Sequence, residues 1–152
     1  MDARSSYREA AVRGATPAQL VIFLYEQTIE DLRRAMVALE KGDIEARTRG
    51  INHAVAVIAQ LQGSLDMERG GDVARNLQLF YNGIRASLCE AQLKQSARIL
   101  EQQIDQLVLV REAWLEVDRA TTMPTPLPAE SAPAPRQPAI SSPKGSPAGW
   151  NA

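Results

Sequence analysis

Apolar residues recur every three or four positions through most of the first 120 residues, a spacing that places them on one face of an α-helix. Three short polar or glycine-containing stretches, around Gly42, Gly70 and Ser96, interrupt this pattern. No stretch alternates apolar and polar residues beyond a few positions, so the pattern predicts no β-strand. It predicts four amphipathic helices, at about residues 16–40, 43–65, 72–93 and 96–120.

Capping residues mark where these helices begin. Thr16 can accept a hydrogen bond from a backbone amide of the first turn, Pro17 fits the first helical position, and Gln19 can complete a capping box. Residues 66–71 are predicted to form the corner between the second and third helices, where two adjacent glycines supply backbone freedom. The N-caps predicted for the other three helices are Asp43, Asp72 and Ser96.

The links between the helices are short. A link of a few residues cannot cross the length of a bundle, so neighbouring helices must run antiparallel. The predicted fold class is therefore all-α, an antiparallel four-helix bundle. The residues predicted to face inward are Ile22, Tyr25, Ile29, Leu32, Met36, Leu39, Ile44, Ile51, Ala54, Ile58, Leu61, Leu65, Val73, Leu77, Phe80, Ile84, Leu88, Ala91, Leu100, Ile104, Leu107, Trp114 and Val117.

The end of the sequence has a different composition. Eight of the nine prolines follow residue 120, and Ala, Pro and Ser dominate there, with only Glu130, Arg136 and Lys144 charged. Such a segment cannot bury enough apolar surface to offset its chain entropy, so it is predicted to be a disordered tail. The predicted organisation is a short N-terminal segment packing on the bundle, the bundle itself, and the tail, at residues 1–15, 16–120 and 121–152.

The helices carry more apolar residues than one inward stripe requires. One interpretation is that this surplus lines a groove for a partner helix; the other is that the stripes are simply wide and that residues 1–14 fold back over the first helix. Sequence reasoning leaves both open. The surplus residues are Leu20, Val21, Phe23, Leu24, Val55, Val57, Leu79, Tyr81, Val108, Leu109 and Leu115.

Charge and hydropathy exclude several classes of partner. The net charge is −1 and acidic and basic residues are interspersed, so no basic surface for nucleic acid is predicted. The longest apolar runs are six residues, at 20–25 and 54–59, which is too short for a signal peptide core or a membrane span. The chain is expected in the cytosol, without direct insertion into a membrane.

Residues capable of catalysis are few. Cys89 lies in a helical pattern with no neighbouring base and is predicted to be a small buried apolar residue. His53 invites comparison with histidine phosphotransfer bundles, but Ala56 and Val57 stand where such domains have lysine and glycine. No Glu-x-x-His pair and no glycine-rich phosphate loop occur. The sequence therefore predicts a protein that is not an enzyme and has no metal or cofactor.

Several short stretches occur in a characteristic order and spacing. They are Tyr7; Ala15-Thr16-Pro17 followed by Leu20-Val21-Ile22-Phe23-Leu24-Tyr25; Leu65-Asp66-Met67-Glu68-Arg69-Gly70-Gly71 followed by Ala74, Asn76-Leu77 and Tyr81; Leu88, Glu90-Ala91 and Lys94; and Ala113-Trp114. Through these stretches, residues 7–117 resemble the flagellar secretion chaperones, which bind flagellin in the cytosol of flagellated bacteria.

The resemblance implies a binding function. Such a chaperone holds the disordered C-terminal region of flagellin, prevents its premature polymerisation and presents it to a component of the flagellar type III export gate. Tyr7 is implied to belong to an N-terminal cover that moves aside when flagellin binds. The alternatives are a phosphotransfer bundle and a helical adaptor with another partner. The residues expected to contact flagellin are Tyr7, Leu20, Val21, Phe23, Leu24, Val55, Val57, Leu61, Leu65, Leu77, Leu79, Tyr81, Val108 and Leu115.

Overall fold

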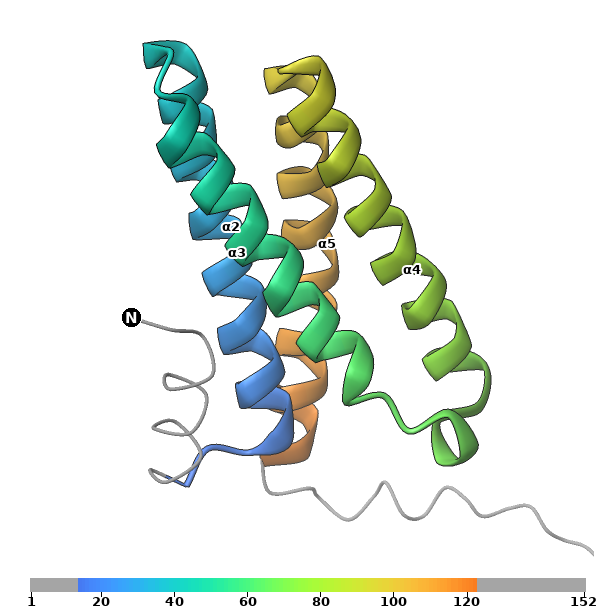
Figure 1. Ribbon diagram of the computed structural model, residues 1–152. Coiled ribbons are helices and arrows are strands. Elements are labelled where there is room, and N and C mark those ends of the chain that lie inside the picture. The colour runs from blue at the N-terminus through green and yellow to red at the C-terminus, as the bar shows by residue number, and fades with distance from the viewer. Residues whose placement is uncertain (1–13, 123–152) are drawn as a thin grey trace, which may run out of the picture. The chain divides into compact units, whose positions relative to one another are not determined.

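The computed structural model describes residues 14–122 of the chain (Figure 1). This part contains four helices and no strand, which confirms the predicted all-α bundle. The predictions for residues 1–13, including Tyr7, and for the tail from residue 123 onward lie outside the described residues. The helices are α2 (Pro17–Lys41), α3 (Ile44–Gly63), α4 (Met67–Lys94) and α5 (Ala97–Thr122).

Successive helices run in opposite directions, as the colour gradient in Figure 1 shows. The described residues up to Asp118 belong to one compact unit; beyond it, the structure describes only residues 119–122, the last turn of α5. All four helices contribute buried side chains to one apolar core. Its members are Leu24, Tyr25, Ile29, Leu32, Ala35, Ile51, Ala54, Val57, Ile58, Leu61, Tyr81, Ile84, Leu88, Ala91, Leu100, Ile104 and Leu107.

Most residues predicted to face inward are buried or half-buried, but three are exposed. Ile44 is 62% exposed, Val73 is 67% exposed and Val117 is 49% exposed, so their prediction as core residues is wrong. Ile44 is the first residue of α3, Val73 follows a break in α4, and Val117 lies near the end of α5. Helical spacing predicts the direction of a side chain, whereas burial also requires a neighbouring helix at that level.

Cys89 is exposed, so its prediction as a buried apolar residue is wrong as well. It directly follows Leu88, which is fully buried. Because adjacent residues of a helix point about 100° apart, the side chain of Cys89 is directed away from the core that encloses Leu88.

The predicted caps of three helices are confirmed. The hydroxyl of Thr16 accepts from the Gln19 amide at 3.1 Å and the Gln19 side chain returns a bond to the Thr16 amide, completing the capping box. The Asp43 carboxylate accepts from the Ala46 amide at 3.0 Å. Ser96 Oγ accepts from the Ile99 amide at 3.1 Å. These local signals therefore fix where α2, α3 and α5 begin.

The cap of the third predicted helix differs from the prediction. Asp66, not Asp72, caps α4, because its carboxylate accepts from the backbone amides of Glu68 and Arg69 at 3.1 and 3.0 Å. The corner contains its own helical turn, which breaks at Gly71, where φ is 54° and ψ is −131°. Asp72 follows this break and pairs with Arg75 of the next turn.

Replacing Gly71 with alanine should lower the free energy of unfolding by about 1–3 kcal/mol. The backbone at Gly71 is in a region that is essentially restricted to glycine, so a Cβ there would strain it. Urea denaturation measures the change. Gly83→Ala is the matched control, since Gly83 is helical with no atom within 4 Å of an added Cβ. It should be neutral or stabilising by up to about 1 kcal/mol. If the two variants lowered the unfolding free energy equally, the backbone at Gly71 would not require glycine.

Candidate functional site

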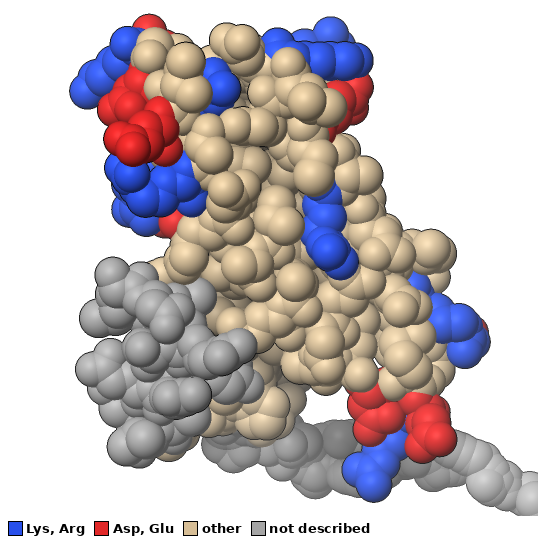
Figure 2. All heavy atoms as spheres, in the orientation of Figure 1, with Lys and Arg blue, Asp and Glu red and all other residues tan. Residues whose placement is uncertain are grey.

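A surface with only one charged residue, Arg85, extends over α3 and α4. Residues 51–65, in α3 and the link that follows it, contain no Lys, Arg, Asp or Glu, and residues 76–89 of α4 contain one, Arg85. Figure 2 shows this surface as a broad tan area that contains one blue side chain, with the other charged side chains gathered near its ends. We call the outer surface of these two stretches the charge-free face. It can receive an apolar partner without removing many charges from water, a step that is costly.

The charge-free face leads into an apolar cavity of about 220 Å³ at the corner between α3 and α4, the corner pocket. Residues of all four helices line it, so it depends on the whole bundle. Its polar lining residues are Ser64 and Asp66, the residue that caps α4. Its other lining residues are Val21, Leu61, Leu65, Gly70, Val73, Ala74, Leu77, Tyr81 and Trp114.

Side-chain hydrogen bonds join α3 to α4 across the charge-free face. Arg85 donates to Gln62 Oε1 at 3.0 Å, and the Gln62 amide donates to Asn82 Oδ1 at 2.7 Å. Gln62 therefore uses both ends of its amide between two residues of α4. Through its hydrogen bond to Gln62, the guanidinium of Arg85, the single charge of the face, is directed toward the contact between α3 and α4.

A buried pair of tyrosines lies beneath the corner pocket. The hydroxyls of Tyr25 and Tyr81 are 2.9 Å apart and hydrogen-bonded, and the rings meet edge to face with centroids 6.2 Å apart. Burial raises the pKa of both phenols, and for Tyr81 the neighbouring Tyr25 raises the pKa further. Hydrogen bonds from Tyr81 and Trp114 partly offset the rise in the pKa of Tyr25. Both phenols therefore stay neutral and tie α2, α4 and α5 together.

Removing the two hydroxyls should have unequal and non-additive effects. Tyr25→Phe leaves the Tyr81 hydroxyl, in a side chain only 1% exposed, without its partner, so it should cost about 1–3 kcal/mol of stability. Tyr81→Phe leaves the Tyr25 hydroxyl with the neighbouring Trp114, which lowers the pKa of Tyr25, and should cost about 1 kcal/mol. The double variant should cost less than the sum, since it leaves no orphaned hydroxyl. A double-mutant cycle by urea denaturation measures this, and strict additivity would contradict the pairing.

Alkaline pH should destabilise the bundle through the same pair. The pKa of each phenol is raised above the ordinary value of about 10 in the folded state, so the unfolded chain loses these protons first. The stabilisation is thus complete below about pH 10 and declines as pH rises beyond it. Unfolding free energies measured between about pH 8 and 11 should show the decline, and the Tyr25→Phe/Tyr81→Phe variant should show a shallower one. If the unfolding free energies of both proteins fall with pH at the same slope, the tyrosine pair is not the cause of the decline.

The structure divides the predicted contact residues into groups. Tyr7 lies outside the described residues. Leu79 is 69% exposed. The half-buried residues are Leu20, Val21, Phe23, Val55, Leu65, Leu77, Val108 and Leu115. The residues buried in the core are Leu24, Val57, Leu61 and Tyr81.

The corner pocket brings together five of these residues, from α2, α3, α4 and the link between α3 and α4, namely Val21, Leu61, Leu65, Leu77 and Tyr81. Leu24 and Val57 are not part of its lining, because the core is wider than one stripe and encloses them. Sequence reasoning did not place Trp114 or Val73 at such a pocket, since both belonged to inward stripes. The irregular apolar spacing at the end of the last helix was the available signal for Trp114.

Other kinds of site find little support in residues 14–122. No group of three or more His, Cys, Asp and Glu side chains in this range is arranged to hold a metal ion. The helices described here include none that is long and apolar enough to cross a membrane. His53 Nδ1 is bonded to Asp31 Oδ2 at 2.5 Å and its Nε2 is buried. A phosphotransfer histidine needs an accessible ring nitrogen, so this arrangement disfavours that alternative.

Residues 1–121 match the protein family described as "Flagellar protein FliS". The chain is similar to the flagellar secretion chaperone FliS of Salmonella typhimurium, with 34% identity over 72% of this chain and 82% of the relative. It is 33% identical to the flagellar secretion chaperone FliSB of Pseudomonas aeruginosa, over 70% and 84% of the two chains. Identity to the flagellar secretion chaperone FliS of Campylobacter jejuni is 30%, over 80% and 94%.

Proposed function

Since this chain belongs to the FliS family of flagellar secretion chaperones, we propose that it binds the disordered C-terminal segment of flagellin in the cytosol. Binding prevents premature polymerisation, and the complex is delivered to a component of the flagellar type III export apparatus. The chain acts by binding and carries out no chemical step.

One observation carries the proposal: the corner pocket opens beside the charge-free face, on which Arg85 is the single charge. An amphipathic segment that folds on binding needs an apolar surface along its length and a recess for at least one large side chain. The charge-free face allows a segment to lie along it with little removal of charge from water, and the corner pocket, with Leu65, Leu77 and Trp114 on its lining, supplies the recess. The polar bonds of Gln62 hold α3 and α4 together beneath the bound segment.

The energetics of such binding are reasonable. Burial of roughly 800 Å² of apolar surface, a usual size for one partner of an interface, contributes at most about 20 kcal/mol. Association and the ordering of a disordered segment cost about 6–20 kcal/mol. Subtracting this cost from the gain allows a net binding free energy of about 8–12 kcal/mol. Such a value corresponds to dissociation constants from micromolar to nanomolar.

Calorimetric titration of the full chain with flagellin tests the proposal. The partner is used intact and lacking roughly its last 40 residues, the length of two amphipathic helices of about 20 residues. We expect binding near one to one with a large negative heat-capacity change, which marks burial of apolar surface and coupled folding. The truncated flagellin should not bind. Equal binding of both forms, or no binding of the intact form, would refute the proposal.

A further inference from the structure

A separate cavity, of about 280 Å³, lies between α4 and α5, and we call it the α4–α5 groove. None of its lining side chains is charged. A charged ligand would lose water here without gaining a counter-charge, so the groove suits an uncharged one. The lining residues are Leu79, Phe80, Gly83, Ile84 and Ser87 of α4, and Gln103 and Gln106 of α5.

The amide of Gln103 has no partner within the protein. Gln103 is only 8% exposed, yet its side chain makes no hydrogen bond to another residue in the range 14–122. The fully enclosed polar side-chain atoms without a partner in this range are His53 Nε2 and Arg111 Nε, so the Gln103 amide retains some access to solvent. It has this access where Gln103 lines the groove. A nearly buried amide without a partner is costly unless water or a ligand satisfies it.

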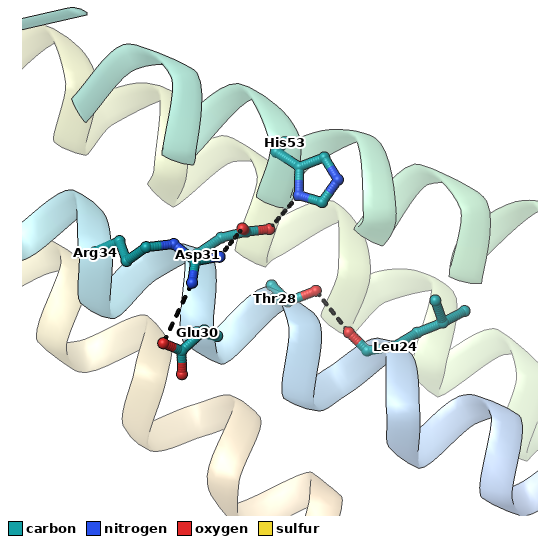
Figure 3. Close-up of polar contacts among 6 residues, drawn as sticks. All are labelled: Leu24, Thr28, Glu30, Asp31, Arg34 and His53. Carbon is teal, nitrogen blue, oxygen red and sulfur yellow. Dashed lines mark hydrogen bonds and ion pairs between the residues drawn. The ribbon is translucent and has the colours of Figure 1, made fainter. Parts of the chain in front are cut away.

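Polar side chains at the contact between α2 and α3 are used differently. There His53 is bonded to Asp31 across the two helices, as Figure 3 shows. In the α4–α5 groove, Gln103, Gln106 and Ser87 form no such bond to any described residue. Amide and hydroxyl groups can both donate and accept hydrogen bonds. The groove therefore presents three such side chains to a ligand.

These groups match an extended peptide. The N–H and C=O groups of an extended backbone are free to bond, whereas a helix uses its own internally. The Gln103 amide holds a donor and an acceptor side by side, so it can pair with both groups of one extended residue. On the α4 side, an added Cβ at Gly83 would meet no atom within 4 Å, which leaves room for a backbone. Leu79, which is exposed, and Phe80, which is half-buried, can pack against an apolar side chain.

Leu79 joins the groove to the charge-free face, since it belongs to both. A disordered segment bound along that face enters the groove where it crosses α4. We propose that the α4–α5 groove binds an extended, uncharged stretch of the flagellin segment, with its backbone paired to the Gln103 amide. This inference rests on the proposed function. It adds a contact of different chemistry to the apolar recess of the corner pocket.

Two glutamine variants test the groove by calorimetric titration with intact flagellin. Gln103→Met removes the amide and keeps most of the side-chain volume, so the bundle should stay folded, which urea denaturation checks. Its affinity should fall about tenfold, as expected for loss of two neutral hydrogen bonds. Gln102→Met is the matched control, since Gln102 is exposed on the same helix and is not part of the lining. Equal affinities of the two variants would overturn the proposal.

NMR of the unchanged chain reports the conformation of the bound stretch. The side-chain NH₂ signals of Gln103 are identified as the pair that disappears in Gln103→Met. The full chain is titrated with a peptide that corresponds to the segment missing from the truncated flagellin. The NH₂ signals should shift and show nuclear Overhauser contacts to Hα protons of the peptide, because an extended backbone lies against the amide. Unshifted signals in a formed complex would overturn the proposal.

The outcomes separate this inference from the proposed function. If intact flagellin does not bind the unchanged chain, the proposed function fails and the inference fails with it. If flagellin binds the unchanged chain and Gln103→Met equally well, only the inference fails. If Gln103→Met alters self-association of the free chain, measured by analytical ultracentrifugation, and leaves flagellin affinity unchanged, the groove is a contact between copies and the proposal is overturned.

Discussion

Leu79→Asp should weaken flagellin binding by about 10- to 100-fold without unfolding the bundle. The Leu79 side chain is 69% exposed on the charge-free face, so the substitution removes little packing and should change stability by no more than about 0.5 kcal/mol. In a complex, however, the new carboxylate would be buried against an apolar segment without a partner. The cost of burying an unpaired charge accounts for the loss of affinity.

The measurement is calorimetric titration with flagellin, together with urea denaturation of the free variant. Leu109→Asp is the matched control, because Leu109 of α5 is also 69% exposed but lies off the charge-free face. Its affinity for flagellin should stay within about twofold of the unchanged protein, a difference below about 0.5 kcal/mol. If both variants lose affinity equally, binding does not take place on α3 and α4 as proposed.

Leu107→Ala should lower the free energy of unfolding by about 3 kcal/mol, in the range of 2–5 kcal/mol found for buried leucines. Leu107 is 0% exposed and belongs to the core that all four helices share. Truncation to alanine removes apolar contacts and leaves a cavity that the surrounding helices can close only in part. The expected loss is a large share of the stability of an ordinary small domain.

Leu109→Ala serves as the control, since it lies two residues away on the same helix with its side chain in solvent. It should change the unfolding free energy by less than about 0.5 kcal/mol. Both variants should unfold in one cooperative transition, monitored by circular dichroism. A small effect of Leu107→Ala would mean that α5 is only loosely joined to the other three helices, contrary to its place in the core.

Much of the fold could be predicted from the sequence because its signals are local. The Thr16 capping box and the cap at Asp43 depend on residues within one turn of each other, and the structure confirms them. The apolar spacing of α2 placed Tyr25, Ile29 and Leu32 in the core for the same reason. Such patterns depend on the backbone geometry of a single helix, which is the same wherever that helix is packed.

Several predictions that depended on the position of a neighbouring helix were wrong. Ile44 and Val73 follow the apolar spacing but lie where no other helix covers them, and Cys89 is directed into solvent. Asp72 has the chemistry of a cap, yet the chain turns at Gly71 and Asp66 caps the corner instead. In each case burial or capping was decided by the position of a second segment, which the local pattern does not contain.

The candidate sites show the same division. By itself the sequence determined four amphipathic helices, their antiparallel order, the scarcity of charges in residues 51–65 and 76–89, and the resemblance that pointed to the family. Only the tertiary structure decided which apolar residues form the corner pocket and that His53 meets Asp31, 22 positions away. A pocket and an ion pair between helices depend on the distance and rotation of two helix axes. These are set by packing of the whole core, so no single stretch of sequence specifies them.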